Sequence, residues 1–391
     1  MKAVDTILVL AGDSDGNLGD RAIAQSTCDE LRRLNPDVKI FVMSDQGERA
    51  RLTYGATPLR RGLLAFPVVL KAAWQSDLVL VGGGGLFQDD DSLIKMPYWG
   101  LRVACTRVFA RRIQGYSIGA GPLQSRISRV FAALALACME SISVRDEGAR
   151  AVLQGLTRKT IQIVPDPAIL LQPAPTEAVD AVLKEAGLDN VGAPLVGITI
   201  RMWFHQMRSY VPHKYAVKYK LRKIPGVRKR QEMVALIARA LDRMVEEQGV
   251  HVVFMPTYNV SHEDDEQICR EIIAEMHSDK VTLLSLNDAK LYMAVASRLT
   301  LMIGGRMHPA ILSSTCGVPV VGVSYNQKFR GFFEHLGIPD NVIDINDFVE
   351  YEQIDELLSL VAKTMDDSSN VSDRIQFLQQ ELRRYNESVL Q

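Results

Sequence analysis

The stretch LMIGGRMHPAILSSTCGVPVVGVSY, residues 301–325, contains the pattern that decides the fold. A short apolar run ends at Gly304-Gly305, a segment with helical periodicity follows, and the apolar run VPVVGVSY comes next. This order predicts a strand, a helix and a second, parallel strand, because buried parallel strands are continuously apolar and are joined by helices. The same succession recurs along the chain from its first apolar run, TILVLAGDSDGNLGD at residues 6–20. The sequence therefore predicts an α/β protein with parallel sheets.

The length of the chain predicts two domains, since 391 residues exceed what one ordinary hydrophobic core accommodates. We expect an N-terminal α/β domain over residues 1–170, a proline-rich linker over 171–194, a C-terminal α/β domain over 195–370 and an amphipathic helix over 371–391. Both domains are predicted to be doubly wound and Rossmann-like. The ligand-binding loops of such sheets follow the carboxyl ends of the strands, so these loops are expected to face a cleft.

Composition excludes several classes of protein. The 45 basic residues nearly balance the 46 acidic residues, which argues against binding of nucleic acid. The five cysteines form no Cys-x-x-Cys pair, and no histidines or carboxylates cluster at metal-binding spacing, so we predict no metal and no cofactor. No signal peptide or membrane-spanning run is evident, and a cytoplasmic protein is expected. The short apolar run FAALALACM, residues 131–139, predicts a buried helix segment.

Arg306 and His308 follow Gly304-Gly305 at the start of the predicted helix. Unpaired backbone N–H groups and the helix dipole favour a phosphate or carboxylate at such a position, and an arginine adds a bidentate fork. A histidine beside a bound anion can donate a proton near neutral pH. The alternative interpretation is that Arg306 pairs with a surface carboxylate and that His308 caps the helix.

Short motifs spread in order along most of the chain carry a resemblance to a known family. Besides the Arg306-Met307-His308 segment, they are Asn17-Leu18-Gly19-Asp20, Gly83-Gly84-Gly85-Leu86-Phe87-Gln88-Asp89, Ile118-Gly119-Ala120-Gly121-Pro122, Val144-Arg145-Asp146, Asp166-Pro167-Ala168 and Gly197-Ile198-Thr199-Ile200-Arg201. Together they resemble the polysaccharide pyruvyl transferase family, in which Arg-Leu-His precedes a helix. Here Met307 replaces the usual leucine, and Gly304-Gly305 stands where a serine is common.

The resemblance implies a fold similar to the two-domain GT-B glycosyltransferase type. It also implies transfer of a pyruvyl group from phosphoenolpyruvate, a co-substrate, to a sugar hydroxyl pair, which forms a pyruvate ketal in surface polysaccharide biosynthesis. The implied catalytic residues are Arg201, Arg306 and His308, with Gly304 and Gly305 beside the donor in the C-terminal domain. Two guanidinium forks suit a donor that carries both a carboxylate and a phosphate. Protonation of the donor's methylene carbon needs a general acid, and His308 is the best candidate.

The N-terminal domain is expected to bind the acceptor. Asn17, Asp20, Gln88 and Asp89 follow predicted strands and can bond sugar hydroxyls, although turn formation and helix capping explain Asn17 and Asp20 equally well. The run Gly82–Gly85 predicts a close approach of the backbone to a ligand or to the other domain.

A nicotinamide cofactor is a weaker hypothesis for the same region. Asp45 ends the predicted second strand, where an acidic residue would bond the ribose, but GDSDGNLGD does not fit the G-x-G-x-x-G fingerprint.

Two charged segments allow more than one interpretation. Residues 201–230 are rich in Lys, Arg and aromatic residues and contain no acidic residue, so they predict a lid over an anionic substrate, a peripheral contact with an anionic membrane or a solvated loop. A membrane contact would suit a lipid-linked glycan acceptor, although a free glycan is equally compatible with the sequence. The acidic segment Ser261–Asp265 predicts a capped helix start, in which Asp264 or a neighbour is an alternative base.

Two other functions remain open at this point. SSTCGVPVVG resembles the donor-domain helix and strand of nucleotide-sugar glycosyltransferases, although the glutamate motif of that helix is missing. A non-catalytic protein that binds a sugar or an anion would also retain such a site.

Overall fold

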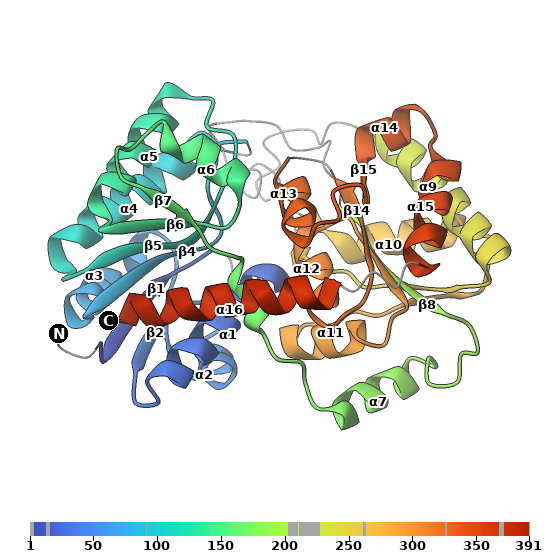
Figure 1. Cartoon of the computed structure of the whole chain (residues 1–391), viewed down its shortest axis with the longest axis horizontal. Helices are drawn as coiled ribbons and strands as arrows, with labels where there is room; N and C mark the ends of the chain where they lie inside the picture. Colours follow the sequence, from blue (N-terminus) through green and yellow to red (C-terminus); the bar gives the residue numbers. More distant parts are fainter. Residues whose placement is uncertain are drawn as a thin grey trace. The chain divides into compact units, whose positions relative to one another are not determined.

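The computed structural model describes residues 4–12, 16–90, 92–201, 210, 227–260, 263–324, 327–366 and 371–390. These residues form two compact units (Figure 1). The first unit contains the described residues up to Leu171, Tyr210 and the residues from Phe377 onward, and the second unit contains the others. Among the described residues, no helix combines the length and the apolar character that crossing a bilayer requires.

The first unit is built on a seven-stranded parallel sheet in the order β3-β2-β1-β4-β5-β6-β7. The strands are β1 (Thr6–Leu10), β2 (Lys39–Met43), β3 (Thr57–Leu59), β4 (Leu78–Phe87), β5 (Ile113–Ala120), β6 (Ser141–Val144) and β7 (Ile161–Ile163). In register, Ile7 of β1 lies between Ile40 of β2 and Leu78 of β4.

Both faces of this sheet are covered, which explains why its strands are mostly apolar. The helices of the unit are α1 (Leu18–Leu34), α2 (Glu48–Tyr54), α3 (Phe66–Gln75), α4 (Lys95–Phe109), α5 (Arg126–Cys138) and α6 (Glu147–Gln154), with short 3-10 turns at Leu63–Ala65 and Pro167–Leu170. Side chains of β1 alternate between two cores: Leu8 and Leu10 pack with α3 to α6, and Ile7 and Val9 pack with α1 and α2.

The C-terminal helix α16 (Val371–Leu390) completes the second of these cores. The hydroxyl of Tyr116 in β5 donates to Oδ1 of Asn386 at 2.9 Å, and Tyr385 stacks on the Tyr116 ring with centroids 6.2 Å apart. Residues from the end of the chain therefore pack beside strands formed near its beginning.

Helix α5 corrects one expectation from the sequence. The run at residues 131–139 is helical, but only one side of α5 is buried, through Ala132, Ala135 and Leu136. Val130 and Leu134 are exposed on its other side. A uniformly apolar helix run cannot show which side faces water, because its periodicity is lost.

The second unit contains a six-stranded parallel sheet in the order β12-β9-β8-β13-β14-β15. Its strands are β8 (Leu195–Thr199), β9 (His251–Phe254), β12 (Val281–Leu283), β13 (Leu301–Gly304), β14 (Val320–Ser324) and β15 (Val342–Asp344), and a separate antiparallel pair is formed by β10 (Asn259–Val260) and β11 (Glu263–Asp264). The helices are α7 (Thr176–Glu185), α9 (Val227–Gln248), α10 (Asp265–Glu275), α11 (Ala289–Ala296), α12 (Met307–Thr315), α13 (Gln327–Leu336), α14 (Ile345–Glu350) and α15 (Ile354–Asp366).

Both sheets reverse their strand order at one place. In the first unit the chain winds outward in both directions from β1 and β4, and in the second unit it does so from β8 and β13. Open α/β sheets bind their ligands at the carboxyl ends of the strands on either side of such a switch point. This arrangement confirms the predicted class of two doubly wound α/β domains, and it directs attention to the loops after β1, β4, β8 and β13.

Candidate functional site

Gly305 joins the two strands at the switch point of the second unit. Its amide donates to the carbonyl oxygen of Thr199 at 2.8 Å and to the Thr199 hydroxyl at 3.0 Å. A Cβ atom on Gly305 would lie 2.4 Å from that carbonyl oxygen, so no larger residue fits without moving the end of β8 away from β13. This contact places Arg201, which follows β8, and Arg306, which follows β13, at neighbouring strand ends.

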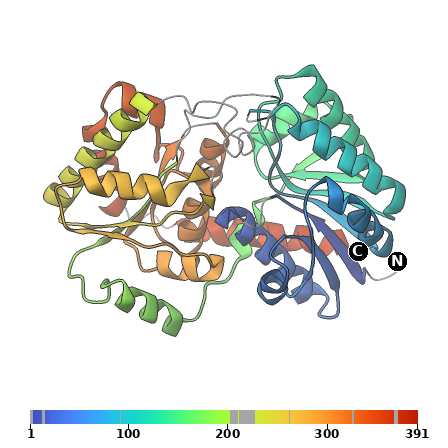
Figure 2. The same ribbon diagram turned by 180° about the vertical axis from the view of Figure 1, so that it is seen from behind.

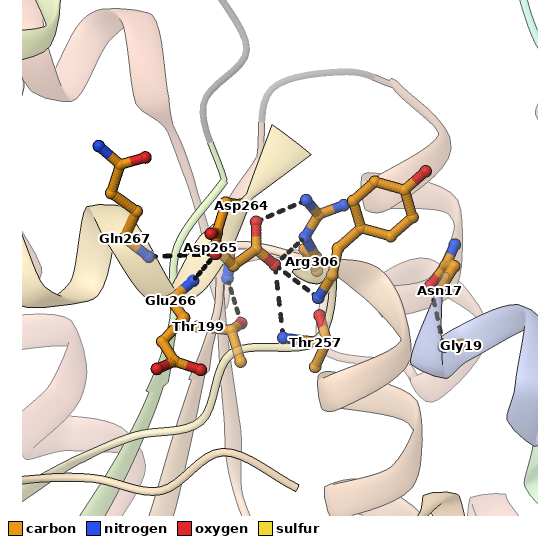
Figure 3. A network of polar contacts seen from close by, with 11 residues as sticks. Asn17, Gly19, Thr199, Thr257, Asp264, Asp265, Glu266, Gln267 and Arg306 are labelled. Atoms are coloured by element: carbon orange, nitrogen blue, oxygen red, sulfur yellow. Dashed lines mark hydrogen bonds and ion pairs between the residues drawn. The ribbon is translucent and has the colours of Figure 1, made fainter. Parts of the chain in front are cut away.

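The guanidinium group of Arg306 forms a bidentate ion pair with Asp265 (Figure 3). Nε donates to Oδ2 at 2.7 Å and Nη2 donates to Oδ1 at 2.6 Å. The side chains are only 11% and 2% exposed, so water screens this pair weakly. The guanidinium also lies 5.1 Å from the centroid of the Tyr258 ring, within range of a cation–π interaction. These contacts fix the plane of the Arg306 guanidinium.

Asp265 is itself held by the backbone. Its Oδ2 accepts from the amides of Tyr258 at 3.1 Å and Thr257 at 3.4 Å, and its own amide donates to the Tyr258 carbonyl at 2.9 Å. Two further groups lie within the electrostatic influence of Asp265. Burial, and then the negative charge of Asp265, raise the pKa of the Tyr292 hydroxyl and of the Cys269 thiol. Both groups therefore stay neutral.

The acidic start of α10 divides into two roles. Asp264 is exposed, and its carboxylate caps the helix by accepting from the amides of Glu266 and Gln267 at 3.0 and 3.2 Å. Asp265, the next residue, points to Arg306 instead. Arg306 thus has the carboxylate partner that the alternative interpretation expected, but that carboxylate is buried and not on the surface. Local sequence gives no signal for this pair, because its members are 41 residues apart.

His308 is the second residue of α12. The N-cap position belongs to Arg306, whose backbone is extended and whose side chain makes no capping bond. His308 is half-buried, and its Nε2 atom is withdrawn from solvent. A partly buried imidazole in the first turn after a strand suits proton transfer to a bound ligand.

Arg201 is half-buried two residues beyond the end of β8. Together with Gly305 it borders a pocket of the second unit that is otherwise lined by aliphatic and aromatic side chains such as Ile198, Ile303 and Phe348. An apolar wall next to a guanidinium lowers the local dielectric and strengthens the attraction of that group for an anion.

The candidate acceptor residues lie at the switch point of the first unit. Asn17 caps α1, since its Oδ1 accepts from the Gly19 amide at 2.9 Å. Asp20 is buried in the first turn of the same helix and faces the glycine run of β4. A Cβ atom on Gly84 would lie 2.6 Å from Asp20 Oδ1, and Gly84 has a φ of 112° that side-chain-bearing residues rarely adopt. The run Gly82–Gly85 therefore lets Asp20 and other groups of the same unit approach the backbone of β4 closely.

Asp89 and Gln88 follow β4. Asp89 is fully buried, and its two carboxylate oxygens accept from the amides of Gln124 at 3.1 Å and Ser125 at 2.8 Å. It therefore ties the loop after β4 to the start of α5. Gln88 is half-buried beside Gly85. Asp45, the residue considered for a nicotinamide cofactor, accepts from the amide and Nε of Arg61 at 2.9 and 3.2 Å.

The structure thus brings the predicted residues together in two groups, one in each unit. Arg201, Gly304, Gly305, Arg306 and His308 surround the β8–β13 switch point, and Asn17, Asp20, Gln88 and Asp89 surround the β1–β4 switch point. Sequence reasoning missed the roles of Asp265, Thr199 and Tyr258 in holding the first group. Most of the basic segment 201–230 lies outside the described residues.

Residues 17–327 match the sequence profile of the family described as polysaccharide pyruvyl transferase. The chain belongs to the polysaccharide pyruvyl transferase family. The match begins at Asn17 and includes both switch points. This pyruvyl transferase family member is also similar to the amylovoran biosynthesis protein AmsJ of Erwinia amylovora, with 27% identity over 126 residues. That match covers 31% of this chain and only 30% of AmsJ.

Solved structures similar to this pyruvyl transferase family member share its fold at low sequence identity. A putative UDP-N-acetylglucosamine 2-epimerase from Listeria monocytogenes has a TM-score of 0.60 and 12% identity, with 99% of this chain and 98% of the other covered. A glycosyltransferase from Rickettsia africae has a TM-score of 0.57 and 9% identity, with 100% and 98% covered. These similarities confirm the expected GT-B type of architecture.

Proposed function

We propose that the chain transfers a pyruvyl group from phosphoenolpyruvate to two hydroxyl groups of a sugar, in the biosynthesis of a surface polysaccharide. Membership of the pyruvyl transferase family supports the reaction class, and the similarity to AmsJ, which is named for amylovoran biosynthesis, supports the polysaccharide context. The observation that carries the proposal is the placement of two arginines and a histidine at the adjacent ends of β8 and β13.

The charge and shape of phosphoenolpyruvate match this group of side chains. The donor presents a carboxylate and a phosphate on a small planar core, and each anion suits a guanidinium fork. Asp265 fixes the plane of Arg306, so part of the entropy of ordering that side chain is lost before the donor binds. Arg201 approaches from the neighbouring strand end, beside apolar side chains. In this proposal, arginines neutralise the donor without a metal.

Ketal formation proceeds by addition and then substitution at one carbon. His308 protonates the methylene carbon of the donor, and one sugar hydroxyl attacks the neighbouring carbon. The bond from that carbon to the phosphate oxygen breaks, and the second hydroxyl takes the phosphate's place. The two hydroxyl protons end on the new methyl group and on the released phosphate, so no redox partner is needed. Positive charge develops at the central carbon, and phosphate then leaves as an anion. Arg306 stabilises the negative charge of the departing phosphate.

The acceptor side of the proposal rests on the first unit. Asn17, Asp20 and Gln88 lie at the β1–β4 switch point, where open sheets bind ligands, and carboxylate and amide groups suit sugar hydroxyls. Asp89 has both carboxylate oxygens engaged by backbone amides, so it holds the loop that presents Gln88. The acceptor is a free or lipid-linked glycan.

Variants of His308 and Arg306 test the proposal by separating donor binding from proton transfer. The His308→Ala protein should bind phosphoenolpyruvate in calorimetry as the parent does, while its turnover falls by about 10²–10⁴-fold, the usual contribution of a general acid. The Arg306→Ala protein should lose donor affinity, because a charge-assisted fork is removed. Uridine diphosphate serves as the control ligand.

Two results would contradict this assignment. Binding of uridine diphosphate without binding of phosphoenolpyruvate would favour a nucleotide-sugar enzyme. A folded His308→Ala protein with normal turnover would remove the histidine from the chemistry.

A further inference from the structure

Helices α3, α4 and α5 form one side of the first unit (Figures 1 and 2). Helix α4 packs closely on α5, since a Cβ atom on Gly100 would lie 2.6 Å from the Phe131 carbonyl oxygen, and α3 packs beside α4. Their inner residues, among them Val69, Val103 and Ala132, are fully buried against the sheet. We call the opposite, exposed sides of these three helices the outer helical face.

The outer helical face carries many exposed large hydrophobic side chains. Most of the exposed large hydrophobic side chains that the structure describes lie on these helices or on the turns that enter them. They include Trp74 at 66% exposure, Leu101 at 51%, Val108 at 78%, Ile127 at 55%, Val130 at 65% and Leu134 at 38%. Exposed apolar side chains gathered on neighbouring helices are typical of an interaction site in a folded protein.

The charged residues of the same helices are all basic. The three helices contain no Asp or Glu, and they carry Lys71, Lys95, Arg107, Arg126 and Arg129 in addition to the buried Arg102. On α5, Ile127, Val130 and Leu134 stand at positions i, i+3 and i+7 and so form one stripe, and the exposed Arg126 and Arg129 lie next to it. Apolar and cationic side chains therefore share one surface.

We propose that the outer helical face binds the surface of a bilayer that contains anionic phospholipids. The apolar side chains would enter the boundary between headgroups and acyl chains, while the arginines and lysines contact lipid phosphates. Arginine and lysine suit this position because their aliphatic stems lie along apolar surface and their charged ends reach the phosphates. A second copy of the chain fits less well, because a two-fold interface would bring these basic residues onto each other without an acidic complement.

The position of the face links it to the loop after β4. Helix α5 begins at Arg126, directly after the two residues whose amides bind Asp89. Through these contacts the loop after β4 is tied to the start of α5. Docking of α5 on a bilayer would therefore hold the carboxyl end of β4 near the lipid surface. The inference depends on the exposed residues alone and stands whether or not the proposed reaction is correct.

Co-sedimentation of the full chain with vesicles tests the inference. Vesicles of phosphatidylglycerol and phosphatidylcholine should bind the protein, and binding should weaken with salt and in vesicles of phosphatidylcholine alone. The double variant Arg126→Glu/Arg129→Glu should lower the partition coefficient at least about tenfold, since each basic residue near an anionic surface contributes about fivefold. The double variant Val108→Glu/Val130→Glu should also lower it, because it replaces apolar side chains that enter the bilayer with charged ones.

Matched controls come from elsewhere in the chain. Leu52→Glu changes a side chain that is 80% exposed on α2, and Lys184→Glu reverses an exposed charge on α7; both should bind vesicles as the parent does. Unchanged unfolding midpoints would show that all variants are folded.

Parent protein that fails to bind anionic vesicles, or double variants that bind as well as the controls, would overturn the inference. A parent dimer in sedimentation velocity that Val108→Glu/Val130→Glu dissociates, without vesicle binding, would identify a second copy as the occupant. Turnover on a soluble glycoside reports on the proposed reaction separately from these results.

Discussion

The guanidinium of Arg306 is paired with the buried carboxylate of Asp265, and the strength of that pair sets the first prediction at the residue scale. Asp265→Asn keeps the shape of the side chain but leaves the buried guanidinium without its counter-charge. We expect the free energy of unfolding to fall by up to about 3–5 kcal/mol, as when a buried pair loses one partner. Phosphoenolpyruvate affinity should fall as well, because the plane of Arg306 is no longer fixed.

Asp264→Asn is the matched control, since it changes the neighbouring residue at the same helix start. Asparagine caps helices about as well as aspartate, so stability and donor affinity should change little. Chemical denaturation measures the stability of both variants, and calorimetry measures their affinity for phosphoenolpyruvate. If the two variants behaved alike, the Asp265 contact would have no special role in holding Arg306.

At the scale of the element, the close approach of β8 and β13 at Gly305 sets a second prediction. In Gly305→Ala the new methyl group would meet the Thr199 carbonyl at 2.4 Å and separate the two strand ends. We expect a loss of about 1–3 kcal/mol in the free energy of unfolding, the usual effect of overpacking, together with weaker donor binding.

Gly155→Ala provides the control for this change. Gly155 ends α6 with a φ of −71°, and nothing lies within 4 Å of the added methyl group. Its stability in a denaturant titration should stay within about 0.5 kcal/mol of the parent value. Equal stability of the two variants would mean that the strand ends tolerate separation.

Particular elements show how far the sequence alone can reach. The segment 301–325 predicts β13, α12 and β14 correctly, because burial, glycine and helical periodicity are all local signals. The partners of the charged groups have no such signal. Asp265 meets Arg306 and Asp89 meets Ser125 only after the chain has folded, 41 and 36 residues away. The exposed side of α5 was equally hidden, because an apolar run without polar residues has no visible face.

At the scale of the whole molecule, the same architecture supports different chemistry. The chain shares its fold with a putative epimerase and a glycosyltransferase at 12% and 9% identity, so the fold does not identify the reaction. What distinguishes one such protein from another is the set of side chains at the switch points. In this chain, Arg201, Arg306 and His308 follow the ends of β8 and β13. All three lie within residues 17–327, which match the family.

The central claim is that phosphoenolpyruvate donates the pyruvyl group that forms a ketal on the sugar. The mass of the product tests this claim most directly. The protein would be incubated with phosphoenolpyruvate and a panel of glycosides, with phosphate and product mass measured in the same samples. We expect one glycoside to gain the mass of one pyruvate less one water, with one phosphate released per product, and pyruvate with ATP should not replace phosphoenolpyruvate. Phosphoenolpyruvate left unchanged across the panel, while a parallel incubation with a nucleotide sugar adds a sugar to one of the glycosides, would contradict the account.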